Sequence, residues 1–183
     1  MYSHHNEPVT FIRDCQAVLI PSGELVSLSE GTVAFITQTL GGSFTVMIEG
    51  NLFRIAGIDA DAIGKESIKP PEVPSNASDS DIEAIIWDQM KTCFDPEIPI
   101  NIVDLGLIYN CSIEKNNSDR FNVQIDMTLT APGCGMGDIL AEDVKEKIKI
   151  IPQIEYVEVL LVFEPPWDQS MMSEVAKLEA GLL

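Results

Sequence analysis

A proline-rich stretch before the middle of the chain separates two segments with different hydrophobic patterns. Residues 65–79 combine several prolines with serine, asparagine and acidic side chains and contain little that could be buried. Such a composition is typical of a semi-extended linker. The 183 residues of the chain suffice for two small domains. We therefore expect a small β-rich N-terminal domain over residues 1–64, a linker over 65–79 and a second domain over 80–183.

The residues before the linker show the short apolar runs and turn residues of β-strands. The run 15–20 ends at a Pro-Ser-Gly turn, and a glycine pair separates the run 32–40 from the run 43–48, which is typical of a hairpin. A further short run, 52–55, follows a Gly-Asn turn. Several short strands in so short a segment predict a small β-barrel or β-sandwich. We find no catalytic set of side chains in this part of the sequence.

A helix pattern begins directly after the linker. Ser80 and Glu83 have the spacing of a capping box. The apolar residues that follow share one helical face: Ile82, Ile85, Ile86, Met90 and Cys93. We expect Pro96 and Pro99 to end this helix.

The rest of the second segment alternates between strand and helix patterns. Strands are expected over residues 107–113, 121–130 and 156–163, and helices over 138–149 and in a terminal stretch that ends near Gly181. The order strand, helix, strand predicts a right-handed crossover onto one sheet. The predicted fold class is therefore α+β: a small α/β domain with a mostly three-stranded sheet and packed helices, preceded by a small all-β domain.

The charge of the chain excludes some partners. Eleven basic residues against 29 acidic ones give a net charge of −18, and no basic cluster is present. Binding to nucleic acid relies on lysine and arginine displacing counterions, so nucleic acid and anionic membrane surfaces are disfavoured. No apolar run approaches the ~20 residues of a membrane span, and residues 1–8 lack the apolar core of a signal peptide. We expect a cytoplasmic protein.

Cys134 is the most conspicuous of the four cysteines, which include no Cys-x-x-Cys pair. It follows a Pro-Gly turn, stands between Gly133 and Gly135, and precedes a predicted helix. Glycine neighbours allow a partner close to the thiol, and a helix N-terminus favours the thiolate, although Asp138 and Glu142 oppose this effect. The alternative is a small apolar residue in a tight turn, and the local pattern leaves both interpretations open.

Two other loops carry polar or aromatic candidates. Asp95, Glu97 and Asp104 could cooperate in metal binding or proton transfer, but such residues more often shape turns through side-chain-to-backbone bonds, which is the interpretation we favour. After the last strand, Glu164 precedes Trp167, which either forms one wall of a binding surface or completes the core. These five residues are our candidate partner surface.

Three sequence motifs resemble a known family. They are Asp-Pro-Glu-Ile-Pro at 95–99, Val-Asp-Leu-Gly-Leu at 103–107 and Thr-Leu-Thr-Ala-Pro-Gly-Cys-Gly-Met-Gly at 128–137. Together they resemble the small domain shared by PaaD-like proteins and eukaryotic cytosolic iron–sulfur assembly proteins. Glu-Pro-Pro-Trp at 164–167, Met-Met-Ser-Glu at 171–174 and the N-terminal β region narrow the resemblance to bacterial SufT-like proteins.

The resemblance implies a non-enzymatic accessory factor for assembling iron–sulfur clusters or delivering them to client apo-proteins. The family's reactive cysteine then falls on Cys134. The residues that would support it form one loop: Thr130, Pro132, Gly133, Gly135, Met136 and Gly137. The implied partners are iron–sulfur scaffold, carrier or client proteins, and a homodimer is a further candidate assembly.

Ligand chemistry limits what one cysteine can hold. A [2Fe–2S] cluster normally takes four thiolates, so we expect no stably bound cofactor and at most a transient cluster or iron with Cys134 as a ligand. One alternative is an adaptor that grips clients with Trp167 and the acidic surface and binds no metal. A thiol enzyme is disfavoured, because such enzymes usually need a histidine base and the two histidines are His4 and His5, near the N-terminus.

Overall fold

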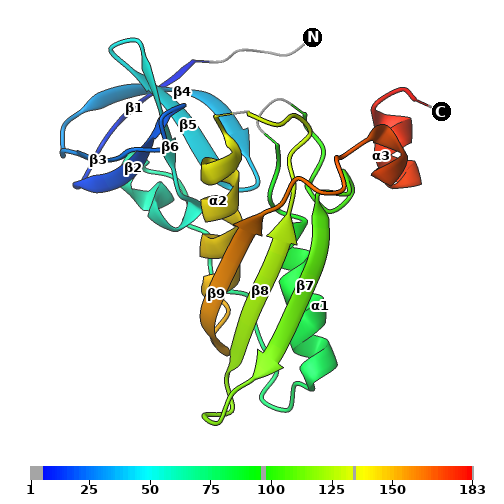
Figure 1. Cartoon of the computed structure of the whole chain (residues 1–183). Coiled ribbons are helices and arrows are strands. Elements are labelled where there is room, and N and C mark those ends of the chain that lie inside the picture. Colours follow the sequence, from blue (N-terminus) through cyan, green and yellow to red (C-terminus); the bar gives the residue numbers. More distant parts are fainter. Residues whose placement is uncertain (1–5, 96–97, 134, 183) are drawn as a thin grey trace. The chain divides into compact units, whose positions relative to one another are not determined.

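The computed structural model describes residues 6–95, 98–133 and 135–182. The chain forms two compact units, Met1–Lys69 and Pro70–Leu183, so the division falls inside the segment expected to be a linker. That residues 80–183 form a domain able to fold alone stays a prediction. Both units are drawn in Figure 1, and the mixed α+β class is confirmed.

The first unit contains a single six-stranded sheet. Its strands are β1 (Glu7–Thr10), β2 (Cys15–Ile20), β3 (Leu25–Leu28), β4 (Val33–Leu40), β5 (Ser43–Ile48) and β6 (Asn51–Ile55). They lie in the order β1-β4-β5-β6-β2-β3, and every pair is antiparallel. The described strands thus form one sheet and not the two of a sandwich. The hairpin predicted around Gly41 and Gly42 is confirmed, and both glycines have positive φ.

Three elements of the first unit were not expected from the sequence. Two are the edge strands β1 and β3, which are short and mostly exposed, so their hydrophobic pattern is weak. The third is the 3₁₀ helix η1 (Gly57–Ile63). Arg13 holds this helix through the carboxylates of Asp59 and Asp61, at 2.9 and 2.7 Å. β1 and η1 depend on partners far away in the sequence, whereas β3 pairs with the preceding strand β2.

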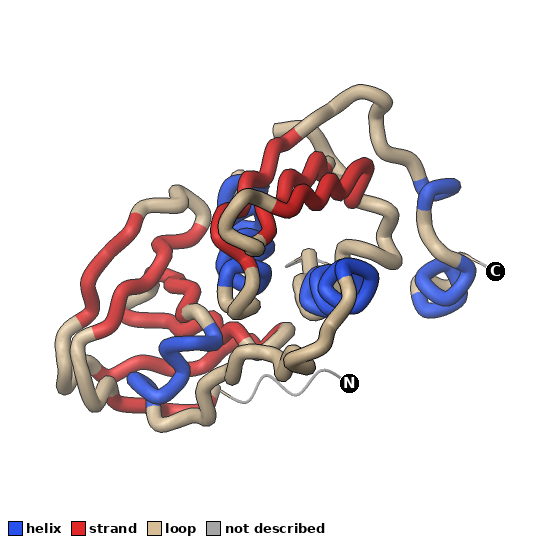
Figure 2. Tube along the Cα trace, turned by 90° about the horizontal axis from the view of Figure 1, so that it is seen from below, coloured by secondary structure: helices blue, strands red, loops and turns tan. Residues whose placement is uncertain are grey.

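The second unit packs its long helices on one face of a three-stranded sheet. It consists of α1 (Asp79–Met90), β7 (Ile108–Lys115), β8 (Phe121–Met127), α2 (Gly137–Lys149), β9 (Ile154–Leu161), η2 (Gln169–Met171) and α3 (Glu174–Glu179). The sheet order is β7-β8-β9: β7 and β8 are antiparallel, while β8 and β9 are parallel and joined through α2. Figure 2 shows α1 and α2 beside this sheet.

Alternation along β8 explains this layering. Phe121, Val123, Ile125 and Met127 are buried and face the helices, whereas the residues between them point to the other face. The helices contribute Ile86 to the same core from α1, and Val144 and Ile148 from α2.

The helix α1 starts earlier and ends earlier than its sequence predicted. Its N-cap is Ser78, not Ser80: the Ser78 hydroxyl accepts a hydrogen bond from the Asp81 N–H at 3.3 Å, and the Asp81 carboxylate accepts one from the Ser78 N–H at 2.8 Å. The two candidate boxes have equal spacing, so the pattern could not choose between them. The helix ends at Met90, well before Pro96, and Cys93 beyond its end is buried in the core.

Candidate functional site

The loop that carries Cys134 leaves the sheet at the carboxyl end of β8. There the Thr128 N–H donates to the Leu107 carbonyl oxygen at 2.8 Å, and the Val162 N–H donates to the Met127 carbonyl oxygen at 2.8 Å. The strand β8 ends at Met127 and not at residue 130 as predicted. These bonds bring the start of the 128–136 loop, the start of β7 and the end of β9 to one end of the sheet.

Residues on both sides of Cys134 are exposed. Cys134 itself lies outside the described residues, as do Glu97 and the two histidines. Pro132, Gly133 and Gly135 are exposed, and Thr130 and Met136 are partly buried. Gly133 has a φ of 82°, and a Cβ atom built there would meet nothing within 4 Å. Glycine is therefore favoured at this position by the backbone conformation, and not because a larger side chain would lack space.

Gly137 lies in a narrow space. It is the first residue of α2 and is buried, and a Cβ atom there would come within 2.6 Å of Leu129 Cδ1. The N-cap of α2 is Met136, which makes no side-chain capping bond. The supporting loop thus joins exposed residues around position 134 to a tightly packed start of α2.

Of the three predicted loop carboxylates, the structure describes Asp95 and Asp104. Asp95 is only 8% exposed, so it does not contribute its side chain to a surface, as the candidate partner surface required. Asp104 accepts a hydrogen bond from Asn101 Nδ2 at 2.6 Å, and its main-chain carbonyl accepts one from the Ser173 N–H at 2.8 Å. Asp104 therefore holds its own turn and ties it to the segment before α3.

Trp167 packs against the core and is partly buried. Its indole N–H donates to the Leu105 carbonyl oxygen at 2.8 Å. This contact favours the interpretation in which Trp167 completes the core, while Glu164 stays exposed.

A shallow groove of about 600 Å³ lies at this end of the sheet, and sequence reasoning missed most of its residues. It is lined by Gly106, Ile108, Tyr109, Asp126, Val162, Glu164, Pro165 and Met171. The Tyr109 hydroxyl donates to the Pro165 carbonyl oxygen at 2.7 Å. Gly106 has a φ of 73°, and a Cβ atom there would lie 2.2 Å from the Met171 carbonyl oxygen. That approach explains the glycine in the Val-Asp-Leu-Gly-Leu motif.

The three other cysteines are poorly suited to reaction or to metal binding. Cys15 in β2 and Cys93 after α1 are 3% and 0% exposed. Burial raises the pKa of Cys15 to about 11, and it raises the pKa of Cys111 in β7 to about 11, where Glu83 adds to the effect. Cys15 and Cys111 therefore stay protonated at neutral pH.

Residues 6–95, 98–133 and 135–182 contain neither a group of metal-binding side chains nor a membrane-spanning helix. No three or more His, Cys, Asp or Glu side chains are grouped there so that they could hold a metal ion. No helix in these ranges has the length and apolar content needed to cross a bilayer.

The second unit is a small α+β domain in which the segment 128–136, with the sequence Pro-Gly-Cys-Gly at 132–135, follows the central strand β8. The model of the family described as "Iron-sulfur cluster assembly protein" matches residues 83–161, all within the second unit. The chain belongs to this family.

Two bacterial proteins similar to this chain are named as Fe-S protein maturation auxiliary factors. The chain is 47% identical over 101 residues to the Fe-S protein maturation auxiliary factor of Porphyromonas gingivalis. This match covers 55% of this chain and 92% of that protein. It is 42% identical over 88 residues to the Fe-S protein maturation auxiliary factor SufT of Staphylococcus aureus, and this match covers 48% of this chain and 96% of that protein. A crystal structure of a domain of unknown function, DUF59, from Bacillus anthracis matches with a TM-score of 0.51 and 33% identity, over 57% of this chain and 95% of that chain.

Proposed function

We propose that this protein is an accessory factor that helps iron–sulfur clusters to be assembled or delivered to client apo-proteins, and that it acts through Cys134 without catalysing a reaction. The observation that carries the proposal is the Pro-Gly-Cys-Gly loop in a chain that belongs to the iron–sulfur assembly family. The names of the relatives, maturation auxiliary factors, agree with such a role.

The distribution of the thiols supports Cys134 as the acting cysteine. Cys15 and Cys93 are buried, and the raised pKa values of Cys15 and Cys111 disfavour the thiolate that binds iron. The neighbours of Cys134, by contrast, are exposed glycines. Of the four positions, 134 is the one whose surroundings would let a partner approach.

The cluster is the cargo in this proposal. One thiolate cannot complete the four-ligand set of a [2Fe–2S] cluster, so the remaining ligands would come from a second copy, a scaffold or the client. Transient, shared ligation suits a factor that passes a cluster on. The partners would be scaffold, carrier or client apo-proteins.

Complementation tests the proposal in a bacterium that lacks its own iron–sulfur maturation auxiliary factor. The strain receives the intact chain, Cys134→Ser or Cys111→Ser, and the activity of a [4Fe–4S]-dependent dehydratase is measured beside that of an enzyme without a cluster. We expect the intact chain and Cys111→Ser to restore the dehydratase and Cys134→Ser to fail. The Cys111 variant is the matched control, since it removes a thiol of the same unit in a strand.

The same experiment separates the alternatives. Full activity of Cys134→Ser would remove the cysteine-based mechanism and leave the adaptor role. Failure of the intact chain would count against the accessory function itself. Anaerobic spectra of the purified protein with iron and sulfide then report whether Cys134 contributes to a bound cluster.

A further inference from the structure

The strand β9 is a free edge of the three-stranded sheet, which has the order β7-β8-β9. An edge strand presents unpaired N–H and C=O groups, and proteins commonly protect such an edge with proline, lysine or a bulge. The segment Ile154–Leu161 contains no proline, lysine or arginine. Its one irregularity lies at Glu155, and from Tyr156 to Leu161 the pairing with β8 is regular. This edge is therefore open to a further strand.

The opposite edge, on β7, is protected. Its pairing with β8 is irregular between Ile108 and Asn110. Lys115 at the other end of β7 forms ion pairs with Asp79 and Asp119, at 3.4 and 2.9 Å. Both edge strands have one irregularity, but β7 also ends in an ion-paired lysine, so β9 is the edge better suited to accept a partner.

One hydrogen bond shows which main-chain groups of β9 point outward. The Val162 N–H donates to Met127 of β8. In a parallel ladder the N–H and C=O of one residue point to the same side, and successive residues alternate. Tyr156, Glu158 and Leu160 therefore bond to β8, whereas the main-chain groups of Val157, Val159 and Leu161 point away from it. Within the described residues, no hydrogen bond to these outward groups is found.

A groove of about 470 Å³ follows this edge. One wall is the consecutive run of β9 residues from Tyr156 to Leu161, and the other is one face of α2, formed by Asp138, Ala141, Glu142 and Lys145. The small side chain of Ala141 leaves room between helix and strand. All lining residues belong to the second unit. An extended peptide of six residues, ~20 Å long, matches the length of this edge.

The charge of the groove indicates a cationic occupant. Its lining holds Asp138, Glu142 and Glu158 against Lys145, and Lys145 already lies 4.0 Å from Glu142. No counter-ion is found for Asp138 or Glu158 among the described residues. A second copy of the chain would bring a net charge of −18 and the same carboxylates to the groove, so self-pairing is disfavoured.

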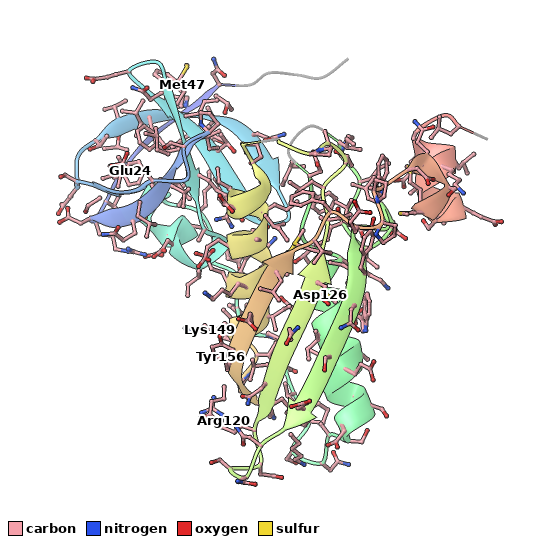
Figure 3. All side chains as sticks on the ribbon, viewed as in Figure 1. Glu24, Met47, Arg120, Asp126, Lys149 and Tyr156 are labelled. Atoms are coloured by element: carbon pink, nitrogen blue, oxygen red, sulfur yellow. The ribbon has the colours of Figure 1, made fainter. Side chains whose placement is uncertain are left out.

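Exposed apolar side chains flank Glu158 on the outer face of the sheet. Tyr156 and Leu160 are 56% and 40% exposed, and Figure 3 shows Tyr156 on β9 and Asp126 on the neighbouring β8. Cross-strand neighbours on an added strand would contact this row. We propose that the edge of β9 binds an extended, lysine- or arginine-containing segment of another protein as a fourth strand of the sheet. The inference goes beyond the role proposed for Cys134 and does not depend on it.

Amide hydrogen exchange measured by NMR on the intact chain tests the added strand. The probe is a capped heptapeptide that alternates lysine and valine. In the free protein we expect fast exchange at Val157, Val159 and Leu161 and slow exchange at Tyr156, Glu158 and Leu160. The peptide should slow the first set at least tenfold. Its fully N-methylated form keeps the charges but has no N–H donors, and it should give no protection.

Protein variants separate hydrogen bonding from charge. Val159→Pro removes an N–H that points away from β8, which an edge strand tolerates, and it should abolish protection by the peptide. If that variant does not fold, Glu158→Lys serves instead, and it should weaken peptide binding about three- to tenfold. Glu114→Lys makes the same charge change on β7, and Cys134→Ser removes the loop thiol. Both should bind the peptide like the unaltered chain.

Four results would overturn the proposal. The first is slow amide exchange at Val157, Val159 and Leu161 already in the free monomer, and the second is slowing by the peptide only at concentrations where sedimentation shows a dimer. The third is equal binding of the N-methylated peptide. The fourth is an equal weakening of peptide binding by Glu114→Lys and Glu158→Lys. The last two would mean that the peptide is attracted by the overall acidic surface and not by the strand edge.

Discussion

Gly106→Ala is expected to destabilise the second unit, because two separate costs coincide at this residue. The φ of 73° lies in the left-handed region, where a Cβ atom costs roughly 1–2 kcal/mol. That Cβ atom would also lie 2.2 Å from the Met171 carbonyl oxygen, 2.7 Å from its carbonyl carbon and 3.0 Å from its Cβ atom. Since two of these atoms belong to the backbone, the segment around Met171 must move.

The movement puts two hydrogen bonds at risk. Trp167 donates to Leu105, and the Ser173 N–H donates to Asp104, from either side of Met171. Each such bond contributes about 1 kcal/mol, so the expected loss of unfolding free energy is about 3–4 kcal/mol in total. A domain with an ordinary stability of about 5–15 kcal/mol would survive this loss and could be measured.

Tryptophan fluorescence during urea unfolding is the suitable assay. The chain has two tryptophans, Trp87 and Trp167, and both lie in the second unit, so the signal reports on that unit. Gly181→Ala is the matched control, because Gly181 has a φ of 71° and nothing within 4 Å of a built Cβ atom. The control should lose only the conformational cost, about 1–2 kcal/mol. If Gly106→Ala loses no more than Gly181→Ala, the contact with Met171 does not hold this segment in place.

Four further outcomes are expected. Timed alkylation followed by mass spectrometry should label Cys134 first, and labelling of Cys111 should accelerate as the pH rises towards its pKa of about 11; slower labelling of Cys134 than of Cys111 would contradict this order. A fragment of residues 80–183 should melt cooperatively, and a broad, non-cooperative transition would count against the domain boundary. Lys147→Met should cost about 3–5 kcal/mol in urea unfolding, because it leaves the buried Asp143, 3.4 Å away, without that partner and removes the hydrogen bond to the Thr92 carbonyl oxygen. Adding Asp143→Leu should recover part of the loss, and no recovery would refute a charge-based explanation. Purified in air, the chain should contain no stoichiometric iron or zinc by elemental analysis, and one tightly held metal per chain would refute transient binding.

The secondary structure of both units was largely predictable, because its causes are local. The glycine pair at 41–42 predicted the β4–β5 hairpin, and the helical and strand periods predicted α2, the start of α1 and the strands β7, β8 and β9 to within a few residues, but not the end of α1. β1 and η1 were missed because their partners lie far away in the sequence, whereas the error at the start of α1 was local in origin. The pattern could not choose between Ser78 and Ser80 as the N-cap, because both have an acidic residue three positions later.

The candidate site was predictable only as a set of motifs. The 128–137 loop could be recognised in the sequence, but Tyr109, Asp126 and Met171 carry no pattern that assigns them to a groove. Asp95 was expected at a surface and is buried. Nothing local distinguishes an exposed loop carboxylate from a buried one, since burial depends on segments that pack against it.

The sequence by itself determined the short-range features of this protein: the turns, the helix and strand periods, the acidic character and the Pro-Gly-Cys-Gly loop. The tertiary structure decided whatever needs two distant segments at once. The pairing of β1 with β4, the bond from Lys147 to the carbonyl oxygen of Thr92 at 2.6 Å and the approach of Gly106 to Met171 are of this kind. Local propensities arise from neighbours within about four residues, whereas these contacts exist only after the chain has folded back on itself.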